Sequence, residues 1–395
     1  MGEMGISKAL SKLRNWRRAC NLEIELNHHY QSKIYSSSSV VQGRLIISPS
    51  SNFDASSISV SLDGVTKIIA TGQHITSTTA HRFLKIDVIT PEIPELVSDT
   101  LKKDQVYTIP FHFILPDQLD STICTHKVTT TSVGEQHLCL PPTMGGWDQE
   151  DMSPGAVEIE YAINACVKSS SPLDSRVSRD LTAKKAIRFV PKSVESPPLH
   201  VSLTSQRYKL QAAKCLRHNS FTQPFGTISA IATQPEAHRL HPYGAVIAPS
   251  FIDISLTFNP AKSGISPPQP NAVSLSARSY TWHQVYPYQV FPDLHERPSL
   301  KEPICATISV DVEYSKIAWL EHLSRSLEDE NGENASPTFY SSTLRLPLSF
   351  SATTKTLLPT FYSCFVSRTY DVRLRLTFGK QDVTIVTPLQ IIAEA

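Results

Sequence analysis

Two short motifs near the middle of the chain combine thiols with imidazoles. Cys124 and His126 form a Cys-Thr-His motif, and His137 and Cys139 form a His-Leu-Cys motif. Residues two apart on a β-strand point to the same side, so two paired strands would bring these four side chains together as a tetrahedral zinc site. The alternative is that they are ordinary residues near a loop, with the cysteines buried as small hydrophobic side chains. Because the strand pairing is assumed, we expect metal-free protein and no cofactor.

The sequence carries none of the common catalytic motifs. It has no Gly-x-Ser-x-Gly, no His-Glu-x-x-His, no phosphate-binding loop and no Gly-x-Gly-x-x-Gly. The pair His295-Glu296 begins like a zinc-binding helix, but Arg297-Pro298 would break that helix and the second histidine is absent. We therefore predict that the protein is not an enzyme and that it has no catalytic residues.

A second candidate site is the basic N-terminal segment, residues 1–19, which has the apolar spacing of a short helix. Such a helix would lie on an anionic membrane surface, with its basic side chains facing the lipid headgroups. The alternative is an extension packed on the first domain, because the apolar stripe is short. A myristoylation motif would need Ser or Thr where the sequence has Ile6. The candidates for membrane-surface contact are Lys8, Lys12, Arg14, Arg17 and Arg18.

Length, charge and cysteine content narrow the class of protein. The 395 residues are too many for one ordinary core and suit two domains. The charged fraction is 18% and the formal net charge is +1, so no strong field points to nucleic acid as a partner. The 7 cysteines are widely spaced, with no Cys-x-x-Cys and no signal peptide. These features predict a cytoplasmic protein with free thiols.

Strict alternation of apolar and polar residues recurs along the chain. Near the C-terminus, one face holds Tyr370, Val372, Leu374, Leu376 and Phe378, and the other holds Asp371, Arg373, Arg375 and Thr377. Antiparallel sheets with one solvated face have this pattern, so we predict an all-β protein built of sandwiches. We expect one further short helix at 316–327 and loops at 260–270 and 328–337.

A polar segment with three prolines, residues 191–198, divides the patterned halves almost evenly. Such a segment is typical of a short, rather stiff linker between domains. We therefore predict an N-terminal extension at 1–19, a first domain at 20–192 and a second domain at 193–395.

The order of several motifs along the chain resembles that of arrestin-like proteins. In the first half these are YSSSSVVQGRLIIS (35–48), YTIPFHFILP (107–116), VEIEYAINACV (157–167) and KKAIRFVP (184–191). In the second half, PTFYSCFVSRTYDVRLRLTFG (359–379) and the TPLQII that follows are similar to the end of an arrestin C-terminal domain. The resemblance spans nearly the whole chain and points to the fungal α-arrestin type, with the arrestin-like subunit of retromer as a more distant relative.

The resemblance implies two tandem immunoglobulin-like antiparallel β-sandwiches and a non-enzymatic adaptor. Such an adaptor links membrane-protein cargo to endocytic, trafficking or ubiquitin machinery in signal down-regulation, at the plasma membrane or endosome. α-Arrestins commonly recruit HECT-type ubiquitin ligases, whose WW domains bind a Pro-Pro-x-Tyr motif. Here the pairs at 141–142, 197–198 and 267–268 all lack the tyrosine. This departure weighs against recruitment by that motif and leaves the adaptor role intact.

A function of another class stays open from the sequence. A β-sandwich carbohydrate-binding module or enzyme would present an aromatic-lined face, and the segment 279–291 is dense in aromatic residues. The opposing interpretation is that these rings cap the core of the second sandwich. An enzyme would show convergent polar residues in a pocket, whereas an adaptor would show shallow concave sheet faces. The candidate rings are Trp147, Trp282, Tyr286 and Tyr288.

Overall fold

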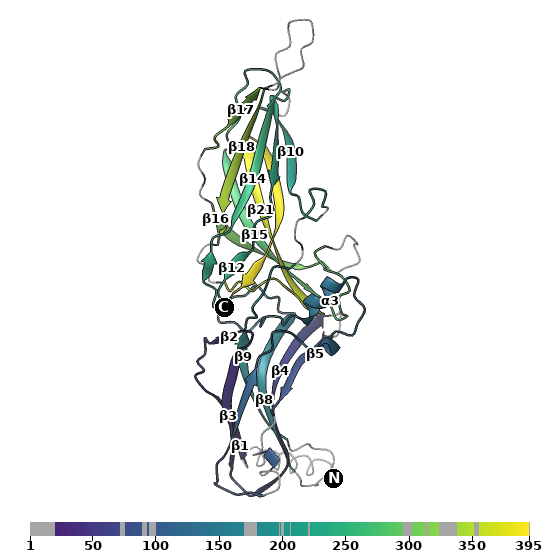
Figure 1. Cartoon of the computed structure of the whole chain (residues 1–395), viewed down its shortest axis with the longest axis vertical. Helices are drawn as coiled ribbons and strands as arrows, with labels where there is room; N and C mark the ends of the chain where they lie inside the picture. Colours follow the sequence, from purple (N-terminus) through teal and green to yellow (C-terminus); the bar gives the residue numbers. More distant parts are fainter. Residues whose placement is uncertain are drawn as a thin grey trace, which may run out of the picture. The chain divides into compact units, whose positions relative to one another are not determined.

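Strands predominate in the computed structural model of the chain (Figure 1), so the predicted all-β class is confirmed. Among the residues that the structure describes, no helix has the length and apolar character needed to cross a bilayer. The basic segment 1–19, the loop 328–337 and the pair His295-Glu296 lie outside the described residues. The described residues are 20–71, 76–88, 93–94, 100–169, 180–196, 198, 201–205, 207–219, 222–294, 302–312, 314, 316–323, 338–350 and 355–394.

Residue contacts divide the chain into two compact units. Unit 1 comprises Met1–Ile123, Leu140–Gly146 and Gly155–Pro191, and unit 2 comprises Cys124–Cys139, Trp147–Pro154 and Lys192–Ala395. The division after Pro191 falls within the polar segment 191–198. Two earlier segments, Cys124–Cys139 and Trp147–Pro154, nevertheless belong to unit 2. Neither segment has an alternating pattern, so no local pattern indicates where it packs.

The part of unit 1 that the structure describes forms two sheets. The smaller sheet has the order β1 (Cys20–Leu26), β3 (Val40–Pro49) and β7 (Tyr107–Ile114). The larger sheet has the order β2 (Ile34–Tyr35), β9 (Leu181–Phe189), β8 (Val157–Ser169), β4 (Phe53–Thr71) and β5 (Thr76–Asp87), and β6 (Thr100–Leu101) pairs with β4. A 3₁₀ turn, Ser121–Ile123, follows β7. Apolar side chains at every second position are buried, as in Ile159, Tyr161 and Ile163 of β8.

The described residues of unit 2 form three sheets and one helix. A five-stranded sheet has the order β10 (Gln211–Leu216), β11 (Gly226–Ala232), β14 (Phe251–Pro260), β18 (Thr338–Pro347) and β17 (Leu320–Leu323). A six-stranded sheet has the order β19 (Ser349–Phe350), β16 (Ile304–Asp311), β15 (Ala272–His283), β21 (Val366–Phe378) and β20 (Phe361–Tyr362), with β22 (Gln381–Leu389) also on β21. A small sheet joins β13 (Val246–Ala248), β12 (His238–Leu240) and β23 (Ile391–Ala393), and the helix is α3 (Thr131–Leu138).

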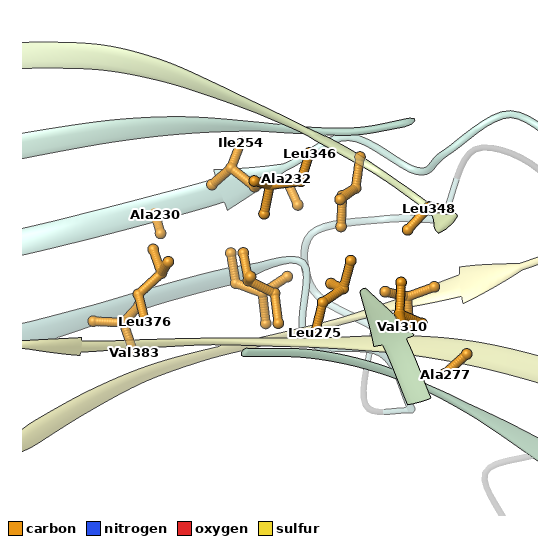
Figure 2. Packing of buried hydrophobic residues seen from close by; sticks show 14 of the residues in the cluster. Ala230, Ala232, Ile254, Leu275, Ala277, Val310, Leu346, Leu348, Leu376 and Val383 are labelled. Atoms are coloured by element: carbon orange, nitrogen blue, oxygen red, sulfur yellow. The ribbon is translucent and has the colours of Figure 1, made fainter. Parts of the chain in front are cut away.

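The core of unit 2 lies between its two large sheets. Figure 2 shows Ile254 and Leu346 of one sheet facing Leu275 and Leu376 of the other, and all four belong to one buried hydrophobic cluster. These leucines and isoleucines occupy the apolar positions of the alternating strands, and all are buried. Burying each such side chain stabilises the fold by roughly 1.5–3 kcal/mol. The alternation therefore builds a sandwich, as the sequence predicts.

Strand β21 departs from the predicted division into a dry and a wet face. All residues from Val366 to Val372 are buried, and the alternation holds only toward the end of the strand. Asp371, expected in water, is 2% exposed, because Arg278 and Tyr280 on the neighbouring strand β15 bind its carboxylate. Arg373, also expected in water, is half-buried, while Arg375 is exposed as predicted.

The predicted helix at 316–327 is wrong in its described part. Residues 320–323 form the strand β17, which pairs with β18, and residues 316–319 are irregular. Pairing with β18 satisfies the backbone of this short segment, which overrides its helical spacing of apolar residues. The loop at 260–270 is observed between β14 and β15.

Candidate functional site

Four side chains with metal-ligand chemistry meet in unit 2. They come from three places: the loop that follows the 3₁₀ turn, the last turn of α3, and the turn between β20 and β21. One candidate ligand atom from each residue lies within 4.8 Å of the other three. We call this group the Cys/His cluster, and its members are Cys124, His126, His137 and Cys364.

The helix α3 places the imidazole of His137. The helix begins at Thr130, whose side-chain oxygen accepts a hydrogen bond from the amide of Val133 (3.4 Å). Such a cap satisfies one of the free amides at a helix start. Val133 and His137 are four residues apart and therefore share one helix face, and both are buried. The helical spacing thus turns His137 inward.

A tight turn places the thiol of Cys364. The amide of Ser363 donates to the carbonyl of Val366 (2.9 Å), and the amide of Val366 donates to Oγ of Ser363 (3.2 Å). The carbonyl of Cys364 accepts from the amide of Tyr288 (2.7 Å). The backbone on both sides of the thiol is therefore fixed, and Cys364 is 7% exposed.

The distances within the Cys/His cluster are short. Sγ of Cys124 lies 3.6 Å from Nδ1 of His137 and 3.7 Å from Nδ1 of His126. The ring centroids of the two histidines are 5.1 Å apart. On its other side, Nε2 of His126 lies 3.0 Å from the carbonyl oxygen of Tyr288. Because a carbonyl oxygen only accepts, Nε2 of His126 donates this hydrogen bond, and Nδ1 is the ring nitrogen that remains for the thiol of Cys124.

Burial sets the protonation states in the cluster. It lowers the pKa of His137 to about 4, assisted by the neighbouring His126. It raises the pKa of Cys364 to about 12, assisted by Cys124. At neutral pH, therefore, the imidazole of His137 is uncharged and the thiol of Cys364 is protonated.

The structure brings together three of the four residues singled out in the two sequence motifs. Cys139 is not among them, because His137 lies on a helix, where residues two apart point in different directions. The thiol of Cys139 instead donates to the carbonyl of Glu135 (3.6 Å). Cys364 takes its place, and sequence reasoning missed it because it lies more than two hundred residues along the chain. The described cysteines other than Cys20 are free thiols, as expected.

Buried carboxylates form a second polar feature of unit 2. Asp371 accepts two hydrogen bonds from the guanidinium of Arg278 (2.6 and 2.9 Å) and one from Tyr280 (2.6 Å). Asp293 is 2% exposed and accepts from the hydroxyls of Tyr208 and Tyr362, each at 3.1 Å. Burial raises the pKa of Asp293 to about 6. Both carboxylates are held by the fold and face no open site.

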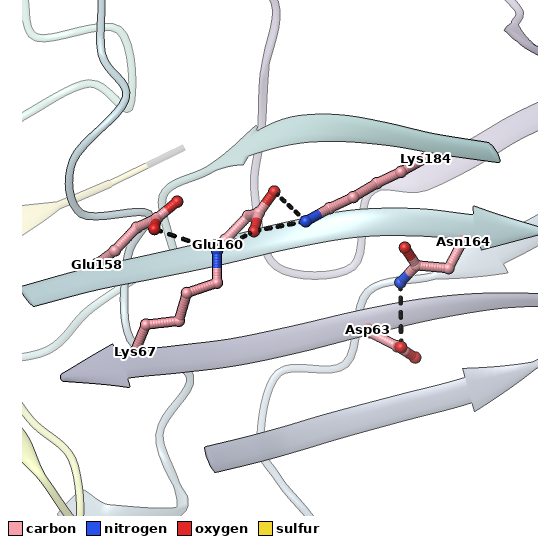
Figure 3. A network of polar contacts seen from close by, with 6 residues as sticks. All are labelled: Asp63, Lys67, Glu158, Glu160, Asn164 and Lys184. Carbon is pink, nitrogen blue, oxygen red and sulfur yellow. Dashed lines mark hydrogen bonds and ion pairs between the residues drawn. The ribbon is translucent and has the colours of Figure 1, made fainter. Parts of the chain in front are cut away.

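The larger sheet of unit 1 carries an ion-pair network on a solvent-facing surface. Figure 3 shows Lys67 of β4 reaching both Glu158 and Glu160 of β8, and Lys184 of β9 reaching Glu160. The nitrogen–oxygen distances to Glu160 are 2.9 Å from Lys67 and 2.7 Å from Lys184. Burial alone would raise the pKa of Glu160, but the hydrogen bonds and charges of the two lysines hold it below its ordinary value.

Beside this network, unit 1 has an open hollow of about 650 Å³. Its walls include His29, Lys33, Lys185 and Arg188 together with the two glutamates of the network. Both glutamates form ion pairs with lysines, and the ring of His29 stacks on that of Tyr35. Charges of both signs thus line a shallow surface, and no nucleophile–base pair of the triad type stands among the lining residues.

The candidate aromatic face does not form. Trp282 and Tyr288 are 6% and 3% exposed and make a small buried cluster with Tyr280, while Tyr286 is 77% exposed. Trp147 is half-buried in its own segment. The buried rings of 279–291 therefore form a small cluster apart from the main core of unit 2. The basic residues Lys8, Lys12, Arg14, Arg17 and Arg18 lie outside the described residues.

Comparison with known families finds a match in the C-terminal part of unit 2. Residues 308–393 match the family model of the Bul1 C terminus, an arrestin-like C-terminal region. The match runs from within β16 to the end of β23 and includes Cys364 and the paired strands β21 and β22. No curated protein matches the chain. The resemblance to arrestin-like proteins is therefore confirmed. Within the chain, residues 308–393 are similar to the Bul1 C terminus.

Proposed function

We propose that the protein is an arrestin-like adaptor for a ubiquitin ligase. The observation that carries the proposal is the match of residues 308–393 to the Bul1 C terminus. The all-β architecture supports it, since an adaptor needs broad, rigid surfaces rather than a catalytic pocket. The finer part of the proposal is that it presents membrane-protein cargo to this ligase for trafficking or down-regulation.

Two features of the described residues favour an adaptor over the alternative, a β-sandwich enzyme or carbohydrate-binding module. Of the four candidate rings for a sugar-binding face, Trp282 and Tyr288 are buried and Trp147 is half-buried, which leaves Tyr286 as the one largely exposed ring among them. The two glutamates that line the hollow of unit 1, Glu158 and Glu160, are already paired with lysines outside its lining. A carbohydrate module uses exposed aromatic rings, and a glycoside hydrolase uses two carboxylates that are free to act, so these two features support the adaptor.

The ligase proposal can be tested by co-purification. The full chain, tagged and expressed in cells, should retain a HECT-type ligase through stringent washing. Because the sequence has no Pro-Pro-x-Tyr motif, an excess of a Pro-Pro-x-Tyr peptide should not release the ligase. A tagged β-sandwich of unrelated sequence serves as control. Failure to enrich any ubiquitin ligase above this control would contradict the proposal.

The membrane part of the proposal rests on residues 1–19. Each basic residue near an anionic leaflet contributes about 1 kcal/mol, so the five of this segment would give transient, salt-sensitive attachment. The test is co-sedimentation of the full chain with vesicles containing phosphatidylserine. Replacing Lys8, Lys12, Arg14, Arg17 and Arg18 with Gln should abolish binding at physiological salt. Equal binding by both proteins would exclude the segment and leave recruitment to protein contacts.

A further inference from the structure

We propose that the Cys/His cluster of unit 2 is a structural zinc site, with Cys124, His126, His137 and Cys364 as its four ligands. Two thiolates and two imidazoles are a ligand set that zinc prefers in structural sites. This proposal replaces the expectation of metal-free protein, which was drawn because the pairing of two strands was only assumed. It is independent of the proposed adaptor function.

The geometry of the cluster is close to that of a zinc tetrahedron. Metal–sulfur bonds of about 2.3 Å and metal–nitrogen bonds of about 2.0–2.1 Å set ligand atoms about 3.3–3.8 Å apart. The separations from Sγ of Cys124 to Nδ1 of His137 and of His126 are 3.6 and 3.7 Å. The largest separation in the group is within 4.8 Å, so small side-chain rotations close the tetrahedron.

The surroundings of the ligands also suit a metal. A zinc-bound histidine usually donates its other ring N–H to a carbonyl or carboxylate, which fixes the orientation of the ring. Nε2 of His126 lies 3.0 Å from the carbonyl of Tyr288 and makes this contact. The backbone of Tyr288 in turn holds the Cys364 turn through its amide (2.7 Å). One residue thus positions two of the four proposed ligands.

The position of the cluster indicates what the metal would do. Cys124–Cys139 is a short segment of unit 2 that is separated in sequence from the rest of the unit. A backbone hydrogen bond ties this segment to the remainder of unit 2: the amide of Thr129 donates to the carbonyl of Gln289 (2.9 Å). A zinc ion would join the two ends of this segment to the β20–β21 turn. It would act as a cross-link between segments more than two hundred residues apart.

Metal analysis of the full chain tests the proposal. The protein would be purified without a histidine tag from cells grown with added zinc, and its metal content measured by mass spectrometry. We expect about one zinc per chain, held through gel filtration. Cys364→Ser and His126→Gln should each lower the zinc content at least about tenfold, since a ligand is lost. Cys139→Ser should keep the full content and is the matched control.

A second measurement on the unaltered chain covers the case in which a variant fails to fold. After the zinc is removed by a chelator, titration with Co²⁺ should give the visible bands of a tetrahedral ion with a sulfur-to-cobalt charge-transfer band, saturating at one equivalent. Added Zn²⁺ should remove these bands. Absence of metal from the purified chain together with no cobalt spectrum would overturn the proposal. So would a Cys124–Cys364 disulfide as the native state of the two thiols, or equal loss of zinc in Cys139→Ser.

Discussion

The two units use charge on their strands in opposite ways. In unit 1 the network of Lys67, Glu158, Glu160 and Lys184 lies on the solvent side of a sheet, with side chains up to 49% exposed (Figure 3). In unit 2 the carboxylates of Asp371 and Asp293 are buried, and hydroxyls or a guanidinium fill their hydrogen-bonding positions. Both groups of charged residues lie on or beside long strands. Water screens the ion pairs of unit 1 but not the buried carboxylates of unit 2.

This difference in exposure predicts different effects of substitution in the two units. Ion pairs that reach solvent contribute little to stability, so the charged face of unit 1 should tolerate substitution. Buried charges that lose a partner are costly, so those of unit 2 are tied to the fold. Substitutions of the buried residues in unit 2 should therefore destabilise the fold strongly, whereas those on the unit 1 network should leave stability almost unchanged.

The largest effect is expected at Leu374, which is 0% exposed in the core of unit 2. Leu374→Asp places an unpaired carboxylate in an apolar layer, at a cost of several kcal/mol out of the roughly 5–15 kcal/mol available to a domain. We expect unit 2 to unfold, as measured by circular dichroism and limited proteolysis. The neighbouring Arg375, which is exposed, provides the control: Arg375→Gln should leave the protein folded. Equal stability of the two variants would show that the faces of β21 are wrongly assigned.

The next effect is expected at Asp371. Asp371→Ala leaves the guanidinium of Arg278 and the hydroxyl of Tyr280 without their acceptor. Removing one partner of a buried pair costs about 3–5 kcal/mol, and we expect the lower end because the Arg278 side chain is 24% exposed. Urea unfolding followed by the fluorescence of buried Trp282 measures the loss. The double change Arg278→Met with Asp371→Leu should recover much of it, and no recovery would contradict the pairing.

Asp293 should make the stability of unit 2 depend on pH. Its pKa in the folded protein is raised to about 6 from a starting value of 3.8, mainly by burial. The folded state therefore holds the proton of Asp293 more tightly than the unfolded state does. The contribution of this group to stability is greatest below pH 4, falls as the pH rises to about 6 and is then constant. Two pKa units correspond to about 3 kcal/mol at most.

Asp293→Asn removes this titration while keeping an acceptor for Tyr208 or Tyr362. The free energy of unfolding of the variant, minus that of the original chain, should rise between about pH 4 and pH 6. Urea unfolding at a series of pH values measures this difference. A difference that does not change with pH would show that the carboxylate titrates normally.

The smallest effect is expected on the unit 1 network. Lys184→Met removes one of two cations on Glu160, and exposed pairs of this kind contribute about 0.2–1 kcal/mol. Thermal unfolding should shift by no more than a few degrees, and the shift should shrink as salt is added. A loss comparable to that of Asp371→Ala would remove the distinction between the two units.

The strands of the two units could be predicted from the sequence because they follow one pattern, the alternation of apolar and polar residues. Side chains alternate along a strand, so apolar residues such as Leu374 and Leu376 mark both the strand and its buried face. The rule fails where a strand is covered on both sides, as in the first half of β21 with Asp371. It also fails at 316–323, where pairing with a neighbouring strand overrides local helical spacing.

The candidate site could be predicted only in part. Cys124, His126 and His137 were found because they are close in sequence and chemically alike. The fourth residue was wrongly taken as Cys139, since a strand was assumed where α3 forms. Cys364 comes from the other end of unit 2, and only the packing of Cys124–Cys139 against β20 and β21 brings it close. Contacts of this range carry no local sequence signal.

The most direct test of the account is ubiquitin-site proteomics on membranes from cells with and without the protein. If it is a ligase adaptor, a defined set of membrane proteins should lose ubiquitin when the chain is absent. Re-expression of the original chain or of Arg375→Gln should restore these sites, and Leu374→Asp should not. An unchanged ubiquitin pattern on every membrane protein in the absence of the chain would contradict the adaptor function.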